Sequence, residues 1–171
     1  MATVERTDAE SVARAYFDAV ARRDVEAMAA CWEPGTRDVI HGVADMRVPE
    51  DLRAWFGDLF AAFPDFSFEV LDVIAAGEKA AVHWHATGTF GGSARFEGLL
   101  PNGERVDVTG CDVLTVRDGK VVHNDAYMNG AEMARQLGAL PPQGSPPEKA
   151  MTALLNLKTR LFARRRRQAS R

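Results

Sequence analysis

The hydrophobic period of the chain changes at Phe66, and this change restricts the possible folds more than any other feature. Before it, apolar residues recur at helical spacing. They predict three helices: about Asp8 to Arg22, Val25 to Trp32, and one that opens at Pro49 and ends before Pro64. After it, apolar and polar residues alternate as in strands. Parallel strands would each need a crossover connection, so this order predicts an α+β fold with an antiparallel sheet.

The second half of the chain supplies the strands and the turns between them. A strand from Phe66 ends at a turn at Gly77 and Glu78. Four further strands are predicted at Lys79 to Phe90, Ala94 to Leu100, Glu104 to Val116 and Lys120 to Met128. The joining turns are rich in Gly, Asn-Gly and Asp-Gly, which favours hairpins. We therefore expect a curved antiparallel sheet closed by the N-terminal helices, a cone with an enclosed pocket.

The C-terminal region differs in composition from the rest. Asn129 and Glu132 form a capping box that predicts a short helix ending at Gly138. A segment rich in Pro, Gly and Ser follows, and then an amphipathic helix that ends in Arg164 to Arg167. The expected organisation is a cone domain at 1–140, a linker at 141–147, and a helix with a basic tail at 148–171.

Charge and length limit the class of protein. With 171 residues, 46% of them hydrophobic, the chain has the size of one globular domain. Its net charge of −3 hides an asymmetry, because residues 1–148 hold 13 basic and 24 acidic residues while 149–171 hold eight basic and no acidic ones. We expect a cytoplasmic protein with no nucleic-acid or membrane partner, the basic tail being the one feature that argues for such contacts. Cys31 and Cys111 are expected to be buried, reduced thiols.

A tight hairpin at Asp118-Gly119 is predicted to place two acidic residues opposite each other. If Arg117 faces Lys120, the same register places Asp112 opposite Asp125. Two carboxylates this close on a pocket face could not both ionise easily, so one should have a raised pKa. A solvated face, or a bulge between residues 110 and 127, would remove this pairing. The nearby His123 and Tyr127 favour a polar site.

Several segments, taken in order, resemble a known family. They are YFDAVARRDVEAMAACWEP, FPDFSFEV, GTFGG, LPNGERV, and DGKVVHNDAYMN followed by QLG. Along residues 10–140 this pattern is similar to the SnoaL-like polyketide cyclases and ester cyclases of the nuclear-transport-factor-two-like superfamily. The superfamily also contains ketosteroid isomerase, limonene epoxide hydrolase and non-catalytic modules, so the resemblance indicates the fold more firmly than the reaction.

The resemblance implies intramolecular aldol chemistry without metal or cofactor. In that scheme Asp125 is the general acid and base, Asp112 and Tyr16 stabilise the oxyanion, and His41 assists proton transfer. Tyr16 and Asp112 also match the oxyanion pair of ketosteroid isomerase, whose base has no counterpart here except the nearby His41. Limonene epoxide hydrolase has an arginine two residues before a catalytic aspartate, where this chain has Gly110, so epoxide hydrolysis ranks lower.

The expected ligand is a hydrophobic, carbonyl-bearing small molecule. The residues expected to bind it are Trp55, His85, His123 and Tyr127. His83 and His85 have the His-x-His spacing of some metal sites, but no further ligand follows at suitable spacing, so no metal is expected. A homodimer is expected from the resemblance. Two alternatives stay open: an isomerase or hydratase of the ketosteroid-isomerase type, and a non-catalytic module for small-molecule binding or dimerisation.

Overall fold

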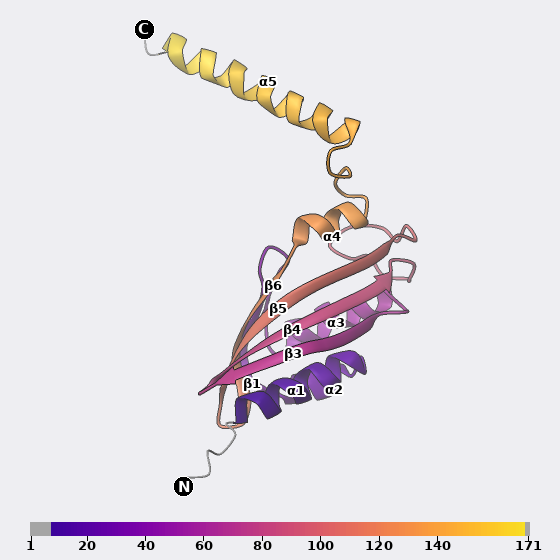
Figure 1. Ribbon diagram of the computed structural model, residues 1–171, viewed down its shortest axis with the longest axis vertical. Helices are drawn as coiled ribbons and strands as arrows, with labels where there is room; N and C mark the ends of the chain where they lie inside the picture. The colour runs from indigo at the N-terminus through magenta and orange to yellow at the C-terminus, as the bar shows by residue number, and fades with distance from the viewer. Residues whose placement is uncertain (1–7, 170–171) are drawn as a thin grey trace.

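Residues 8–169 are described by the computed structural model of the protein, which shows a curved, unclosed sheet with helices packed on its concave side (Figure 1). The three predicted N-terminal helices are present as α1 (Asp8–Ala21), α2 (Val25–Ala30) and α3 (Glu50–Ala62). Asp24 caps α2, since its Oδ1 accepts the Ala27 N–H at 3.0 Å. The expected α+β class is confirmed.

The sheet has six strands in the order β2-β1-β6-β5-β4-β3. Their bounds are β1 Trp32–Ile40, β2 Ala44–Arg47, β3 Ser67–Ala76, β4 Lys79–Thr89, β5 Arg105–Arg117 and β6 Lys120–Met128. The last four form an antiparallel meander, as predicted. The expectation of a wholly antiparallel sheet is wrong at one pair, because β1 and β6 run parallel. Residues 41–119 lie between these two strands and allow the crossover that parallel pairing requires.

Strand β1 is absent from the sequence-based prediction because Pro34 and Gly35 read as a helix stop. In the structure both lie where the β1–β6 ladder is interrupted, between Trp32 and Arg37, so the missing proline N–H costs no ladder bond there. Beyond this point Arg37 to Ile40 pair regularly with β6 on one side and with β2 on the other. A segment expected to be a loop is therefore an interior strand.

The predicted strand Ala94 to Leu100 is wrong. This segment belongs to the long β4–β5 connection and holds only an isolated bridge between Phe96 and Leu99. Its start is tied to the end of α3, where the Gly92 N–H bonds the Ala62 carbonyl at 2.9 Å and the Ser93 N–H bonds the Ala61 carbonyl at 3.0 Å. Free helix carbonyls thus take the place of a neighbouring strand.

The β5–β6 hairpin contains a bulge that decides which side chains face inward. Arg117 pairs with Lys120 as predicted, but the register shifts between Val116, which pairs with Val121, and Thr115, which pairs with His123. Val122 is the extra residue. Beyond it every pair is displaced by one, so Asp112 faces Ala126 and Asp125 faces Val113. Because side chains alternate between faces, the predicted pairing of Asp112 with Asp125 is wrong.

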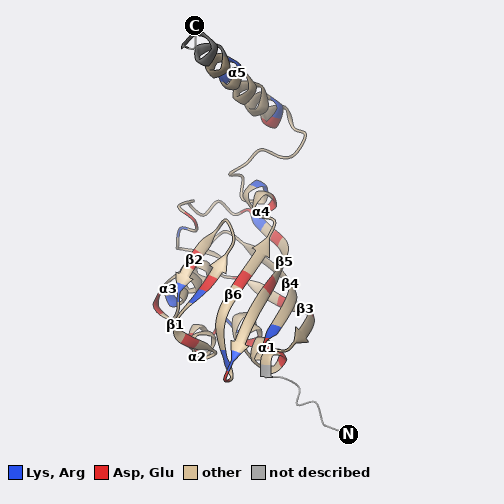
Figure 2. Ribbon diagram, turned by 90° about the vertical axis from the view of Figure 1, so that its left-hand side faces the viewer, with Lys and Arg blue, Asp and Glu red and all other residues tan. Residues whose placement is uncertain are grey.

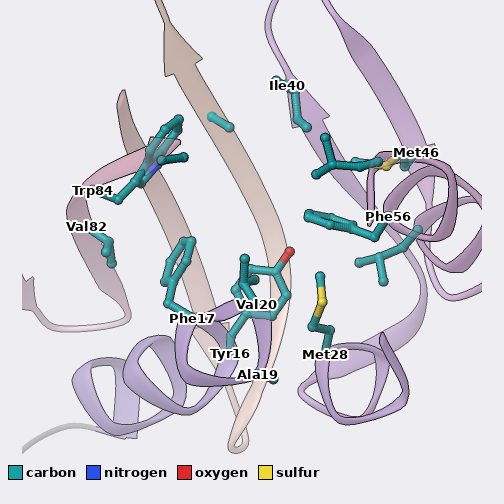
Figure 3. Packing of buried hydrophobic residues seen from close by; sticks show 14 of the residues in the cluster. Tyr16, Phe17, Ala19, Val20, Met28, Ile40, Met46, Phe56, Val82 and Trp84 are labelled. Carbon is teal, nitrogen blue, oxygen red and sulfur yellow. The ribbon is translucent and has the colours of Figure 1, made fainter. Parts of the chain in front are cut away.

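The core fills the space between the helices and the concave face of the sheet. Figure 3 shows Tyr16 and Phe17 from α1 reaching toward Trp84 of β4, with Ile40, Met46 and Phe56 at the other side. Tyr16 is 1% exposed, yet it carries a hydroxyl that must find a partner inside. Aromatic pairs continue this packing, for example Phe17 stacked on Phe68 with ring centroids 5.5 Å apart.

Two helices follow the sheet. Helix α4 (Gly130–Gln136) is capped by Asn129, whose Oδ1 accepts the Glu132 N–H at 3.1 Å, as predicted. Helix α5 (Pro146–Ala169) stands away from the sheet (Figures 1 and 2). Among the described residues, none of the helices has the length and hydropathy needed to cross a membrane.

Candidate active site

A cavity of about 100 Å³ lies between the helices and the sheet. Its walls are largely aromatic: Phe17, Trp55, Phe56, Phe63, Phe66, Phe68, Trp84 and Phe96. The remaining lining is aliphatic except for Tyr16, Asp38, Asp112 and Thr87, and it includes no Lys, Arg or His. Such a cavity suits a small apolar ligand whose polar group meets the acidic end.

The acidic end is a continuous hydrogen-bonded network. Tyr16 donates its hydroxyl to Oδ2 of Asp38 at 3.1 Å. The side-chain nitrogen of Asn124 donates to Oδ1 of Asp38 at 2.9 Å and to Oδ2 of Asp112 at 2.7 Å. Trp84 Nε1 donates to the other oxygen of Asp112 at 2.7 Å. Every oxygen of the two carboxylates therefore has one donor, and none of these donors is a cation.

Both carboxylates are buried, with Asp38 1% and Asp112 6% exposed. Burial raises the pKa of Asp112 to about 7, and the charge of Asp38 adds to the increase. Burial also raises the pKa of Asp38 to about 6, although the hydrogen bonds from Asn124 and Tyr16 oppose this rise. For Tyr16, burial and then the charges of Asp38 and Asp112 raise the pKa well above its usual value. At neutral pH Asp38 is thus mostly ionised and Asp112 is about half protonated, while Tyr16 keeps its proton.

Asn124 separates the two carboxylates. Its two amide hydrogens point to one carboxylate each, so neither acid can share a proton directly with the other through these oxygens. The side chain is 1% exposed, and its Oδ1 has no hydrogen-bond partner. An unpaired buried acceptor costs roughly 1–3 kcal/mol, which the two donated bonds must offset.

Gly110 makes room for the indole that supports Asp112. A Cβ at this position would lie 2.6 Å from Cη2 of Trp84 and 2.7 Å from the carbonyl oxygen of Tyr127. Trp84 thus occupies the space that a side chain at 110 would need, and from there it donates to Asp112. A side chain at position 110 therefore does not fit while Trp84 keeps this place.

Three of the residues predicted from sequence line the cavity: Asp112, Tyr16 and Trp55. Trp55 also donates from Nε1 to Oε1 of Glu97 at 3.1 Å and packs edge-on against Phe96 with ring centroids 5.6 Å apart. It therefore joins α3 to the β4–β5 connection. Its half-buried ring places it at the rim of the cavity.

The other predicted residues do not line the cavity. They lie on the convex face of the sheet: Asp125, His41, His123, Tyr127 and His85. Asp125 points outward because of the bulge at Val122. Asp125 accepts from His41 Nε2 at 2.8 Å and lies 3.1 Å from His123 Nε2. The hydrogen bond to His41 and the charge of His123 lower the pKa of Asp125, the reverse of the expected direction. The predicted catalytic and binding positions of these side chains are corrected accordingly.

The remaining residues of this face form small polar contacts. His41 stacks on Tyr127 with ring centroids 4.5 Å apart, and His85 Nε2 lies 2.8 Å from Oδ1 of Asp107. Within residues 8–169, no group of three or more His, Cys, Asp or Glu side chains is arranged to hold a metal ion. The thiols of Cys31 and Cys111 are free, and both residues are half-buried rather than buried.

Asp38 is the cavity residue that sequence reasoning missed. It lies on β1, the strand hidden by Pro34 and Gly35, so its inward direction was not apparent. In the structure buried Asp38 and Ile40 alternate with the more exposed Arg37 and Val39, but the sequence Arg-Asp-Val-Ile does not alternate polar and apolar residues and so gives no local signal. Asp38 also follows α2, where the resemblance to ketosteroid isomerase had left the base without a counterpart.

Comparison with protein families identifies the fold and its relatives. Residues 13–124 match the model of the SnoaL-like domain. The chain belongs to the SnoaL-like family. Among proteins of curated function, no sequence matches it.

Solved structures with a similar fold agree with this. A SnoaL-like, proposed polyketide cyclase from Jannaschia is 24% identical, with a TM-score of 0.71 over 82% of this chain and 99% of that one. IdmH from Streptomyces antibioticus, a proposed polyketide cyclase, is 26% identical, with a TM-score of 0.60 over 75% and 97%. AclR from Streptomyces galilaeus, a proposed hydroxylase, is 24% identical, with a TM-score of 0.67 over 91% and 95%. The fold thus accommodates more than one named chemistry.

Proposed function

We propose that this SnoaL-like protein is a cyclase that works without cofactor, by acid and base chemistry on a small apolar molecule with two carbonyl groups. The observation that carries the proposal is the pair of buried carboxylates, Asp38 and Asp112, at the polar end of an otherwise apolar cavity. A general acid and a general base work best with pKa values near the working pH, and the raised pKa values of this pair meet that condition.

The roles follow from the order of the two pKa values. Asp38, with a pKa of about 6, is mostly ionised at neutral pH and removes a proton from the carbon next to one carbonyl. Asp112, with a pKa of about 7, is protonated in about half of the molecules at neutral pH, and in this neutral form it donates a hydrogen bond to the developing oxyanion. Tyr16 stays protonated because its pKa is raised. Its hydroxyl, which lies beside Asp38, becomes a second donor to that oxygen once Asp38 has taken up the substrate proton.

Ring closure then needs no further protein group. The enolate carbon attacks the second carbonyl carbon of the same molecule, one carbon–carbon bond forms, and the new alkoxide takes back the proton held by Asp38. The apolar walls exclude water that would otherwise protonate the enolate early. The absence of Lys, Arg and His from the lining supports an uncharged substrate over a phosphate or carboxylate.

A small dicarbonyl probe tests this proposal. Heptane-2,6-dione is a small apolar diketone that closes to a six-membered hydroxy ketone, which gas chromatography detects. We expect Asp38→Asn and Asp112→Asn each to lower the rate at least about 100-fold, the usual contribution of a positioned acid or base. Asp125→Asn is the matched control and should stay within about twofold. Unchanged rates in both cavity variants, or equal loss in Asp125→Asn, would contradict the assignment.

An isomerase is the second candidate, and Asp38 is the observation that favours it. With Asp38 in the cavity beside Tyr16 and Asp112, a carboxylate base and two oxyanion donors are all present. The same enolate, protonated at a different carbon, would move a double bond into conjugation. Cyclohex-3-enone tests this reaction, since its conversion to the conjugated ketone raises the ultraviolet absorbance. Turnover of this probe without closure of the dione would favour the isomerase.

Three further expectations stay proposals. If the protein is a non-catalytic binding module, both probes should stay chemically unchanged, and their binding should still raise the temperature at which the protein unfolds. A hydratase would add water to an unsaturated ketone. A homodimer could form through the convex face, where Leu71, Ile74 and Tyr127 are exposed. Sedimentation velocity of the purified protein measures that state directly.

A further inference from the structure

Helix α5 is the feature that the proposed function leaves unexplained. It is 24 residues long and carries most of the large apolar side chains that the described residues expose. They are Met151, Leu154, Leu155, Leu157, Leu161 and Phe162, which are 39%, 67%, 56%, 53%, 52% and 53% exposed. Apolar groups exposed together in this way usually mark a contact surface.

The helix is amphipathic along its described part. At 3.6 residues per turn, Met151, Leu154, Leu155, Leu161 and Phe162 fall on one face. Lys149 and Arg160 fall on the opposite face, and Lys158 reaches over the Phe162 ring with Nζ 6.0 Å from its centroid. The apolar face therefore contains one lysine, Lys158, and the face opposite to it is basic.

The helix leaves this face free because it begins away from the sheet. Its first turn is tied to α4 by the ion pair of Arg135 with Glu148 at 3.3 Å, and the rest projects outward (Figure 2). The sequence adds Arg164 to Arg167 toward its end, so 149–171 holds eight basic and no acidic residues. The remaining 148 residues carry a net charge of −11, from 13 basic and 24 acidic residues.

These observations favour one occupant. Pairing of two α5 helices from two copies would bring Lys158 from each helix together and oppose two strongly basic segments. Docking of α5 on the acidic body of another copy would bring opposite charges together. That body offers no matching apolar surface, however, because its exposed large apolar residues are scattered over β3, the β4–β5 connection and β6: Leu71, Ile74, Leu100 and Tyr127. Nucleic acid would not use the apolar face. An anionic lipid surface can accommodate both the apolar face and the basic side chains of the helix.

We propose that α5 binds reversibly to anionic membrane surfaces and lies in the interface with its Met, Leu and Phe face toward the acyl chains. This revises the expectation of no membrane partner and is independent of the proposed reaction. The acidic body is repelled by the same surface and stays in water with its cavity accessible. A cavity lined by aromatic side chains and a helix at the lipid surface would together give the protein access to apolar molecules that partition into the bilayer.

Sedimentation of the full chain with unilamellar vesicles tests this proposal. We expect binding to vesicles of phosphatidylcholine and phosphatidylglycerol in a ratio of about 7 to 3, and at least about tenfold weaker binding to phosphatidylcholine alone. Raising the salt from about 50 to 500 mM should weaken binding by a similar factor. The double variant Leu154→Gln, Leu161→Gln should lose binding at least about tenfold, whereas the matched variant Thr152→Gln, Asn156→Gln on the opposite face should retain it.

Both variants should unfold thermally like the wild type, because these positions are exposed. Equal binding to both vesicle types, or no binding to either, would overturn the proposal. So would a duplex DNA affinity that Leu154→Gln, Leu161→Gln leaves intact, since that result would assign the helix to nucleic acid. A concentration-dependent dimer that the same variant abolishes would assign the face to a second copy and would also overturn it.

Discussion

Asp112 and Asp125 lie on neighbouring strands of one hairpin, yet their environments are opposite. Asp112 points into the cavity, is 6% exposed and accepts hydrogen bonds only from the uncharged Trp84 and Asn124. Asp125 points outward, its side chain is 34% exposed, and its partners are the imidazoles of His41 and His123. The pKa of the first is raised to about 7, and the pKa of the second is lowered.

One residue of register produces this difference. Had Val122 been paired, Asp125 would face the cavity beside Asp112, and the two would form a directly opposed pair. With the bulge, the inward acidic partner is instead Asp38, supplied by the parallel strand β1. Carboxylates of the same type thus take different chemical roles according to burial and the charge of their donors.

The largest expected effect is on the pH dependence of stability. The raised pKa values of Asp38 and Asp112 mean that the unfolded chain loses these protons near pH 4, whereas the folded protein loses them near pH 6 and 7. Stability from this source is fully present below pH 4 and is lost as the pH rises through 6 and 7. Between pH 5 and 8 the free energy of unfolding should fall by about 4 kcal/mol.

Urea unfolding followed by tryptophan fluorescence at several pH values measures this fall. Asp112→Asn should reduce it to roughly 1–2 kcal/mol, since only Asp38 remains, and Asp125→Asn should leave it unchanged. Because an asparagine at 112 cannot accept from both Trp84 and Asn124, this variant could fold poorly. A carbon-13 titration of the wild-type aspartate carboxyls covers that case. Normal titration near pH 4 for both Asp38 and Asp112 would contradict the proposed difference in pKa between the inner and outer carboxylates.

How far the sequence predicts this arrangement depends on local signals. The bounds of β6 and the caps at Asp24 and Asn129 follow from short patterns that the structure keeps. The Asp118-Gly119 turn also forms as predicted, but a turn fixes register only up to the first bulge. Nothing in the run of Val121, Val122 and His123 marks which residue is unpaired, because that choice is made by packing across the whole sheet.

Asp38 was hidden for a related reason. Its strand has Pro34 near its start, and local propensity there opposes the structure that tertiary pairing with β6 imposes. The acidic end of the cavity therefore joins residues from α1, β1, β4, β5 and β6, of which only Tyr16 and Asp112 were identified from sequence. Sites assembled across strands require the register of every strand, and sequence patterns give that register least reliably.

The second prediction concerns the space that Gly110 leaves for Trp84 on the inner face. Gly110→Ala should displace the indole and its hydrogen bond to Asp112, at a cost of roughly 1–3 kcal/mol for overpacking. The control is Gly57→Ala in α3, where a Cβ would meet nothing within 4 Å, and this variant should be neutral or slightly stabilising. Chemical unfolding compares the two. Equal stability of both variants would show that the inner face adapts without cost.

The smallest expected effect lies on the outer face. Asp125→Asn weakens the contacts with His41 and His123, which are 45% and 43% exposed, so water screens them. At pH 7 it should therefore cost less than about 1 kcal/mol, the range of exposed ion pairs. Because the pKa of Asp125 is lowered, its contribution is present above pH 4 and is lost as the pH falls below that value.

A double-mutant cycle with His41→Gln isolates this contribution. The coupling free energy between positions 41 and 125 should be small at pH 7 and should decrease toward zero as the pH falls below 4 and the wild-type carboxylate becomes protonated. This pH trend is opposite to that of the inner pair. A coupling of several kcal/mol at pH 7 would mean that the outer contact is as strongly shielded from water as the inner one, and the contrast between the two faces would then rest on chemistry other than burial.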